Sequence, residues 1–194
     1  MNTQALHTYL LRAIEAYPYD LTQTLEALNY ALSIDPDNAH ALSLMAQLCH
    51  EQLDDYEQAK DYYEAALASR LDLPKVYPKF IFLLLQSAEL DEAQRVIDFA
   101  LTVKGIDRAS IMAAQGQLFE QREQFENAEE ALQKAKFYAY NAHFLEYVDG
   151  ELNRIKLKKK IQFRTANATE TEMKQPQQTA ESKNWFMNRL NNLL

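Results

Sequence analysis

The sequence is poor in the residues that make tight turns, with three glycines and five prolines in 194 residues. Average usage would give about fourteen glycines, and β-hairpins and phosphate-binding loops depend on this residue. We therefore expect neither a β-sandwich or barrel nor a nucleotide-binding α/β fold, and we predict an all-α protein. The hydrophobic content of 47% fits a globular chain long enough to bury a sizeable core.

Cysteine and long apolar segments are also scarce. The single cysteine, Cys49, cannot form an internal disulfide, which fits a reducing compartment. The longest apolar run has only six residues, from Phe80 to Leu85, so no membrane-spanning helix is expected. The first residues lack the charged and apolar regions of a secretory signal peptide. These absences predict a soluble cytoplasmic protein.

Charge is distributed unevenly along the chain. Residues 1–153 carry 11 Lys and Arg against 25 Asp and Glu, a net charge of −14, whereas residues 154–194 carry 9 against 3, a net charge of +6. An acidic body repels phosphate, so nucleic acid is not an expected partner. We interpret the basic segment from Arg154 to Arg164 as a solvated helix end, with an acidic partner or an anionic lipid surface as the alternative.

Small and large apolar residues recur with a period of 34 or 35 residues. A small residue at i and i+7 with a large one at i+4 marks a single helix face, against which another helix can pack closely. A unit of this size cannot bury its own apolar face and must stack on its neighbours. The four columns are Leu21, Tyr56, Leu90 and Phe125; Thr24, Ala59, Ala93 and Ala128; Leu28, Tyr63, Ile97 and Leu132; and Ala31, Ala66, Ala100 and Ala135.

This pattern resembles the tetratricopeptide repeat (TPR) family, whose motif of about 34 residues forms two antiparallel helices. The best match is the unit with Gly116, Phe125, Ala128, Leu132 and Ala135. The resemblance implies a right-handed α-solenoid of about four helix pairs over residues 1–140. The family's tryptophan column is absent here, and its proline column survives only once, after the second predicted helix.

The helix-breaking residues and the apolar periodicity predict where the paired helices lie. Pro18, Pro36, Pro74 and Gly105 fall between helices, whereas Pro78 is tolerable only in the first turn of a helix. The predicted pairs are 3–16 with 21–34, 39–53 with 55–70, 75–88 with 90–103, and 107–122 with 125–139.

Three further segments follow the repeats. Residues 141–162 predict a capping helix, because a solenoid needs a terminal unit with a polar outer face. Residues 163–183 contain almost no apolar side chain and predict a flexible linker. Residues 184–194 predict an amphipathic docking segment, which could pack on its own solenoid, on a partner or on lipid. Its docking residues are Trp185, Phe186, Leu190, Leu193 and Leu194.

The sequence contains no catalytic or metal-binding signature. Phosphate loops, nucleophile elbows, Cys-x-x-Cys and His-Glu-x-x-His motifs are all missing. His40 and His50 would lie about 15 Å apart along one helix, too far to share an ion. We expect these histidines to be polar positions on an exposed helix face, and we predict a noncatalytic protein without cofactor or metal.

In the TPR family the first helix of each pair lines a concave groove, and this resemblance supplies the candidate binding residues. The co-chaperones of the family hold acidic C-terminal peptides with asparagines and an arginine that have no match here. Phe82 could instead belong to the core, because its helix is apolar almost all round. The candidate groove residues are His40, Ser43, Gln47, His50, Lys75, Lys79, Phe82, Gln86, Gln117, Glu120 and Gln121.

These observations favour a protein–protein interaction module: an adaptor, assembly factor or chaperone that holds a peptide or helix in its groove. The C-terminal tail would then be a second docking element. The alternative is a membrane-associated assembly protein that uses the basic segment and the terminal amphipathic helix. An enzyme or enzyme subunit is a third hypothesis. The sequence leaves the identity of the partner and the oligomeric state open.

Overall fold

In the computed structural model, residues 3–174 are described, with side chains up to residue 165. This part of the chain forms nine α-helices and no strand, which confirms the all-α prediction. The helices are α1 (Thr3–Ala16), α2 (Leu21–Ile34), α3 (Ala39–Gln52), α4 (Tyr56–Ser69), α5 (Val76–Gln86), α6 (Leu90–Ala100), α7 (Arg108–Gln121), α8 (Phe125–Tyr138) and α9 (Ala142–Lys174).

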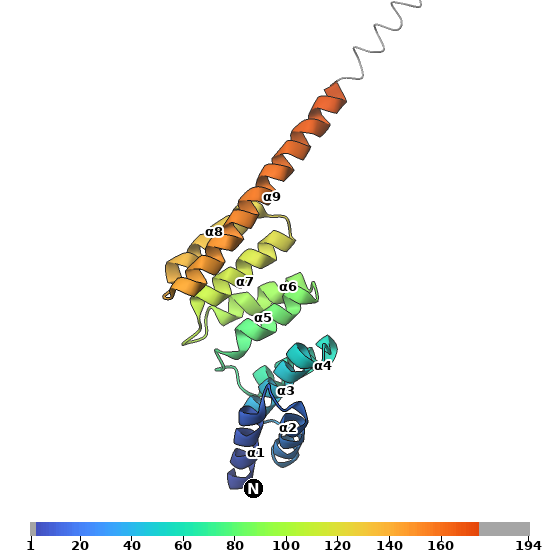
Figure 1. The fold of residues 1–194 in the computed structure, drawn as a ribbon, viewed down its shortest axis with the longest axis vertical. Helices are drawn as coiled ribbons and strands as arrows, with labels where there is room; N and C mark the ends of the chain where they lie inside the picture. The colour runs from blue at the N-terminus through green and yellow to red at the C-terminus, as the bar shows by residue number, and fades with distance from the viewer. Residues whose placement is uncertain (1–2, 175–194) are drawn as a thin grey trace, which may run out of the picture.

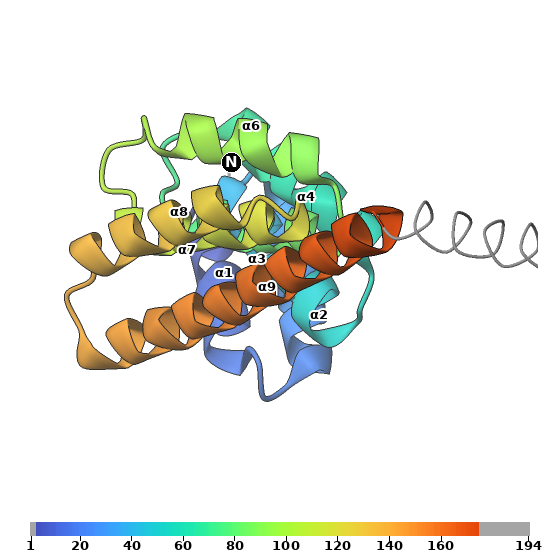
Figure 2. The same cartoon turned by 90° about the horizontal axis from the view of Figure 1, so that it is seen from above.

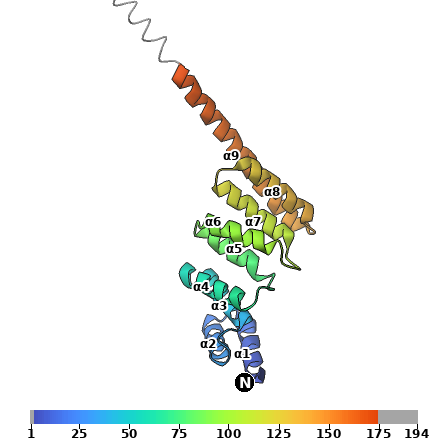
Figure 3. The ribbon, with the colours of Figure 1, turned by 180° about the vertical axis from the view of Figure 1, so that it is seen from behind.

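The first eight helices form four antiparallel pairs that stack along the long axis of the molecule (Figure 1). The stack is also clear from behind, where α1 and α2 lie at one end and α9 at the other (Figure 3). Helix α9 packs along α8 and then projects beyond the body (Figures 1 and 2).

The repeating small residues lie where the helices cross. The six alanines of the last three units are completely buried, and so is Thr24, whose hydroxyl donates a hydrogen bond to the Asp20 carbonyl at 2.7 Å. Gly116 allows the closest approach, since a Cβ there would lie 2.7 Å from Cγ of Leu132. Close packing of the pairs therefore depends on side-chain size at these columns. The alanines are Ala59, Ala66, Ala93, Ala100, Ala128 and Ala135.

Helix starts follow the capping chemistry of the sequence. The side chains of Asp20, Asn38, Asp55 and Asp107 each accept a backbone N–H in the first turn of the following helix. Helix α5 begins at Val76, so its proline lies in the first turn as predicted. Helix α6 ends at Ala100, three residues before the predicted end, and a run of turns follows.

Helix α9 is longer than the sequence suggested. It reaches Lys174, so the prediction that the capping helix ends at residue 162 is wrong, and residues 163–174 are helical rather than a linker. The chain has no glycine or proline from residue 151 to residue 175, and Ala, Glu, Met and Lys are good helix formers. The polar composition was therefore misread as an absence of structure. Residues 175–183 and the docking segment 184–194 lie outside the described residues.

One face of α9 closes the C-terminal end of the core. Val148, Leu152 and Ile155 are at most 3% exposed and join a cluster with residues of α7 and α8. Cys49, in α3, is likewise buried within the main cluster. The interior therefore consists of two clusters of buried residues, one from α1 to α7 and one from α7 to α9.

Candidate partner-binding groove

The first helices of the second, third and fourth pairs present equivalent positions along one side of the stack. A shift of 35 residues relates Gln47 of α3 to Phe82 of α5 and to Gln117 of α7. The same shift relates Gln86 of α5 to Gln121 of α7. Most of the predicted groove residues therefore lie on one surface, as their spacing suggested.

Hydrogen bonds join these side chains between neighbouring helices. Lys79 Nζ of α5 donates to Gln47 Oε1 of α3, and Gln47 Nε2 donates to Glu51 Oε2 at 2.9 Å. His50 Nε2 lies 2.5 Å from Gln86 Oε1. The structure therefore brings four of the predicted residues into direct contact across the α3–α5 boundary.

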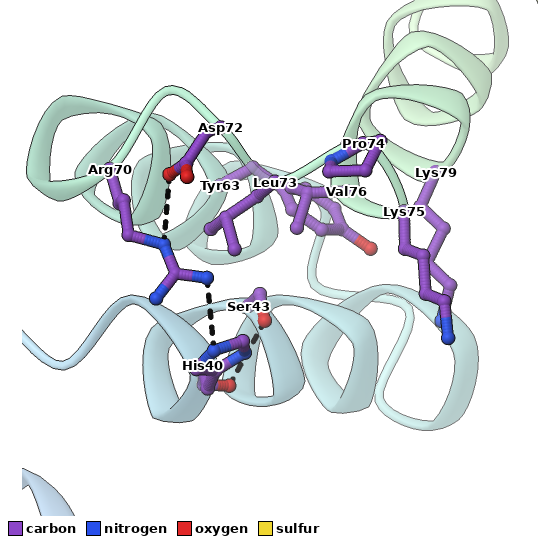
Figure 4. A pocket seen from close by; sticks show the side chains of 10 residues that line it. All are labelled: His40, Ser43, Tyr63, Arg70, Asp72, Leu73, Pro74, Lys75, Val76 and Lys79. Carbon is purple, nitrogen blue, oxygen red and sulfur yellow. Dashed lines mark hydrogen bonds and ion pairs between the residues drawn. The ribbon is translucent and has the colours of Figure 1, made fainter. Parts of the chain in front are cut away.

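A pocket of about 440 Å³ opens between α3 and the segment that joins α4 to α5 (Figure 4). Its apolar wall consists of Leu73, Pro74 and Val76. Arg70 lies at one end, where its guanidinium is 3.0 Å from an Asp72 oxygen. The predicted groove residues His40, Ser43, Lys75 and Lys79 complete the lining.

The floor of this pocket holds a buried hydroxyl without a partner. Tyr63 is fully buried, lines the pocket, and makes no hydrogen bond through its hydroxyl within the described residues. Burial raises the pKa of Tyr63, so the hydroxyl stays protonated and able to donate. An unpaired buried donor of this kind is costly to the folded protein.

The same pocket is lined by three cations and one carboxylate, although the body is acidic. Lys75 and Lys79 extend side by side from α5 (Figure 4), and neither forms an ion pair with any described residue. Burial lowers the pKa of Lys79, and burial together with the nearby Arg70 lowers the pKa of His40. Burial is the main cause of both shifts, since it disfavours the charged form of each group.

The C-terminal end of the groove is occupied by α9. Glu120 is 8% exposed and accepts hydrogen bonds from Arg154 Nη2 at 2.6 Å and Nε at 2.9 Å, while Lys158 Nζ lies at 2.7 Å. Burial alone would raise the pKa of Glu120, but the two cations hold it below the ordinary value. The carboxylate predicted for the groove therefore fastens α9 to α7. Gln117 is also engaged, because it donates to the Tyr147 hydroxyl at 2.8 Å.

The exposure of two predicted groove residues corrects one prediction and decides between two alternatives for the other. His50 is 6% exposed and lies between the rings of Tyr56 and Phe82, so the prediction of an exposed position is wrong. His50 occupies the position in α3 that Leu85 occupies in α5, and the stacking of the repeats buries both side chains. Phe82 is 48% exposed, so it belongs to the surface rather than to the core.

Sequence reasoning missed the contribution of α1 to the groove. A shift of 33 residues relates the buried Ala13 and Ala16 of α1 to the buried Ala46 and Cys49 of α3. The same shift places Ile14, which is 54% exposed, at the position of Gln47. Ala13 and Ala16 could have revealed the alignment of α1 with the later first helices. The turn around Pro18 differs in length from the later turns, however, so the spacing of 34 or 35 residues does not apply to α1.

Other classes of site find no support in the described part of the chain. No group of three or more His, Cys, Asp or Glu side chains there could hold a metal ion. No helix among residues 3–174 combines the length and the apolar character that crossing a bilayer requires.

Comparison with known proteins identifies the fold. No sequence profile of a known family and no curated protein matches the chain. Solved structures do match: PilF of Pseudomonas aeruginosa has a TM-score of 0.71 at 21% identity, covering 81% of this chain and 70% of its own. A tetratricopeptide repeat protein from Parabacteroides merdae has a TM-score of 0.65 at 16% identity, covering 89% and 68%.

A third structure, that of the type IV pilus biogenesis factor PilW, has a TM-score of 0.62 at 18% identity and covers 78% of each chain. At these identities the likeness establishes a shared fold. The stacked helix pairs, the buried small-residue columns and these neighbours together define a TPR-like α-solenoid.

Proposed function

We propose that the protein is a noncatalytic interaction module that binds a peptide or helix of another protein along the groove. The observation that carries this proposal is that Lys75 and Lys79 line the Tyr63 pocket, while Phe82, which is 48% exposed, follows Lys79 by three residues on α5. An aromatic anchor next to polar donors is the usual composition of a peptide-binding surface. A partner with an apolar side chain near an acidic or carbonyl oxygen would use all of these groups.

An adaptor or assembly role is consistent with this chemistry. PilW, whose structure is similar, is a pilus biogenesis factor, and for the present chain an assembly role is part of the proposal. The tail, with Trp185, is proposed as a second docking element on the basis of its sequence alone. Because the α9 end of the groove is closed by the contacts of Glu120, binding is proposed over α1, α3 and α5.

The groove is tested by affinity capture from an extract of the source organism, using the full chain. We expect the double variant Lys79→Ala, Phe82→Ala to capture at least about tenfold less partner than the wild type, since central aromatic and charged anchors dominate binding. The matched control is Phe99→Ala, because Phe99 of α6 is 44% exposed and similar in size. Equal capture by the double variant and the wild type would refute binding in the groove.

The tail is tested separately with a chain that ends after Lys174, the last residue of α9, and with the fluorescence of Trp185, the only tryptophan. We expect the shortened chain to capture less partner, and the emission of the full chain to shift to the blue when the partner is added. A solvated emission that does not change with the partner would remove the tail from the proposal and leave the groove untouched.

A further inference from the structure

The projecting part of α9 is chemically unlike the rest of the molecule. Residues 154–164 contain six cations and no acidic side chain, whereas residues 1–153 carry a net charge of −14. Three large apolar side chains are exposed within the same eleven residues: Leu157 at 59%, Ile161 at 52% and Phe163 at 68%. An exposed apolar and basic surface of this kind is uncommon on a solvated helix end.

Helical geometry arranges these residues into a defined face. Leu157 and Ile161 are four residues apart and therefore adjacent, on the side of α9 opposite the buried Ile155. Lys156, Lys160 and Arg164 follow one edge of this apolar ridge, whereas Arg154 and Lys158 turn toward Glu120 of α7. We call this surface, residues 156, 157, 160, 161 and 164, the outer face of α9.

Part of the positive charge on α9 is not compensated. Arg154 and Lys158 bind Glu120, and Lys159 lies 3.1 Å from Glu126. By contrast, Lys156, Lys160 and Arg164 are exposed and form no ion pair within residues 3–165. These three cations recur at every fourth position and thus follow one side of the helix.

The outer face lies at the end of the stack. Helix α9 is the last helix of the array and projects past α8, and no other helix of the described chain covers its outer side (Figures 1 and 2). The acidic repeats lie on its opposite side. A flat surface could therefore approach the ridge of Leu157 and Ile161 without meeting the body, while Lys160 and Arg164 line a pocket with Glu126 of α8.

We propose that the outer face of α9 binds the surface of an anionic lipid bilayer. An apolar ridge beside a row of unpaired cations resembles the helices that lie in the membrane interface. Anionic headgroups would satisfy Lys160 and Arg164 on one edge while the ridge enters the boundary of the acyl chains. A second copy of the same face is disfavoured as the occupant, because two such surfaces carry charge of one sign.

This surface is separate from the groove, so the two proposals stand or fall independently. With α9 on a membrane, the stack would extend away from the bilayer and the groove would remain open to a protein partner. The proposal therefore adds a site for lipid and does not change the function proposed for α1, α3 and α5.

The experiment is flotation of the full chain with vesicles of phosphatidylcholine alone and of phosphatidylcholine mixed with phosphatidylglycerol. We expect binding only to the mixed vesicles, weakening as salt is raised. The triple variant Lys156→Gln, Lys160→Gln, Arg164→Gln should bind about a hundredfold more weakly, from roughly fivefold per cation near the surface. The double variant Leu157→Ser, Ile161→Ser should also lose binding.

The matched control replaces three cations elsewhere, with Arg95→Gln, Lys104→Gln and Lys134→Gln, and should keep the wild-type affinity. Circular dichroism of each variant checks that the helices are intact. Absence of binding to mixed vesicles overturns the proposal, and so does equal binding to neutral ones. Unchanged binding of the triple variant would place the lipid contact in the tail and also overturns it. Loss of self-association in the triple variant, without vesicle binding by the wild type, would assign the face to a second copy.

Discussion

The two ends of the helical stack meet the solvent in different ways. At the N-terminal end, α1 has polar, exposed side chains at positions that are buried in the first helices of later units. At the C-terminal end, α7 and α8 keep their apolar surface, and an additional helix covers it. The N-terminal residues are Thr8, Arg12 and Glu15, in place of Ala41, Met45 and Leu48 of α3 and of Val76, Phe80 and Leu83 of α5.

The difference shows that a repeat array can be terminated by substitution or by addition. Substitution changes three side chains and leaves α1 as a member of the array. Addition supplies a helix with two faces, of which only one is used for packing. The C-terminal solution therefore leaves a second face for another purpose, which the N-terminal solution does not.

The largest effect is expected from removing the apolar contact of the added helix. Ile155 is fully buried, and Ile155→Ala should lower the free energy of unfolding by about 2–5 kcal/mol through the cavity it leaves. Urea denaturation measures the change. Arg12→Ala at the opposite end is the control and should leave the stability unchanged. Equal effects at both ends would contradict the distinction between them.

A smaller effect is expected at the charged contact of the same helix. Arg154→Ala should cost about 1–2 kcal/mol at neutral pH, because the buried Glu120 keeps only Lys158 and the buried Glu151 loses its ion pair. The exposed pair of Lys134 and Glu130 is the control, and Lys134→Ala should have no measurable effect.

The pH dependence of this difference follows from the pKa of Glu120. Its pKa is lower in the folded protein, so the contact stabilises the protein above the ordinary pKa of a glutamate. That stability is lost as the pH falls through the folded pKa. The gap between the wild type and Arg154→Ala, measured by denaturation, should therefore shrink below about pH 4. A gap that is constant from neutral to acidic pH would exclude an electrostatic origin.

The smallest expected effect has the opposite sign. Gly150 lies in α9, and a Cβ there would meet no atom within 4 Å. Gly150→Ala should therefore raise the stability by about 0.5–1 kcal/mol, since alanine loses less backbone freedom in a helix. Thermal denaturation would detect the gain. The same change at Gly116 should destabilise, because the new methyl group would collide with Leu132.

The sequence predicted the paired helices well because their determinants are local. Periodic alanines, capping residues such as Asp107, and the proline positions each act within a few residues. Features that depend on distant partners were harder to predict. Glu120 acquires its role from Arg154, 34 residues away on α9, and His50 is packed between Tyr56 of α4 and Phe82 of α5. The end of α9 was missed for a different reason, since a polar helix has no apolar periodicity.

The burial of Cys49 has a practical consequence for chemical labelling. Burial and the nearby Asp55 raise the pKa of this thiol, so little reactive thiolate forms at neutral pH. Because the chain has no other cysteine, a thiol introduced at a surface position would react almost alone with a maleimide dye. A fluorophore at residue 161 could then report the polarity around the outer face of α9 without a background from the interior.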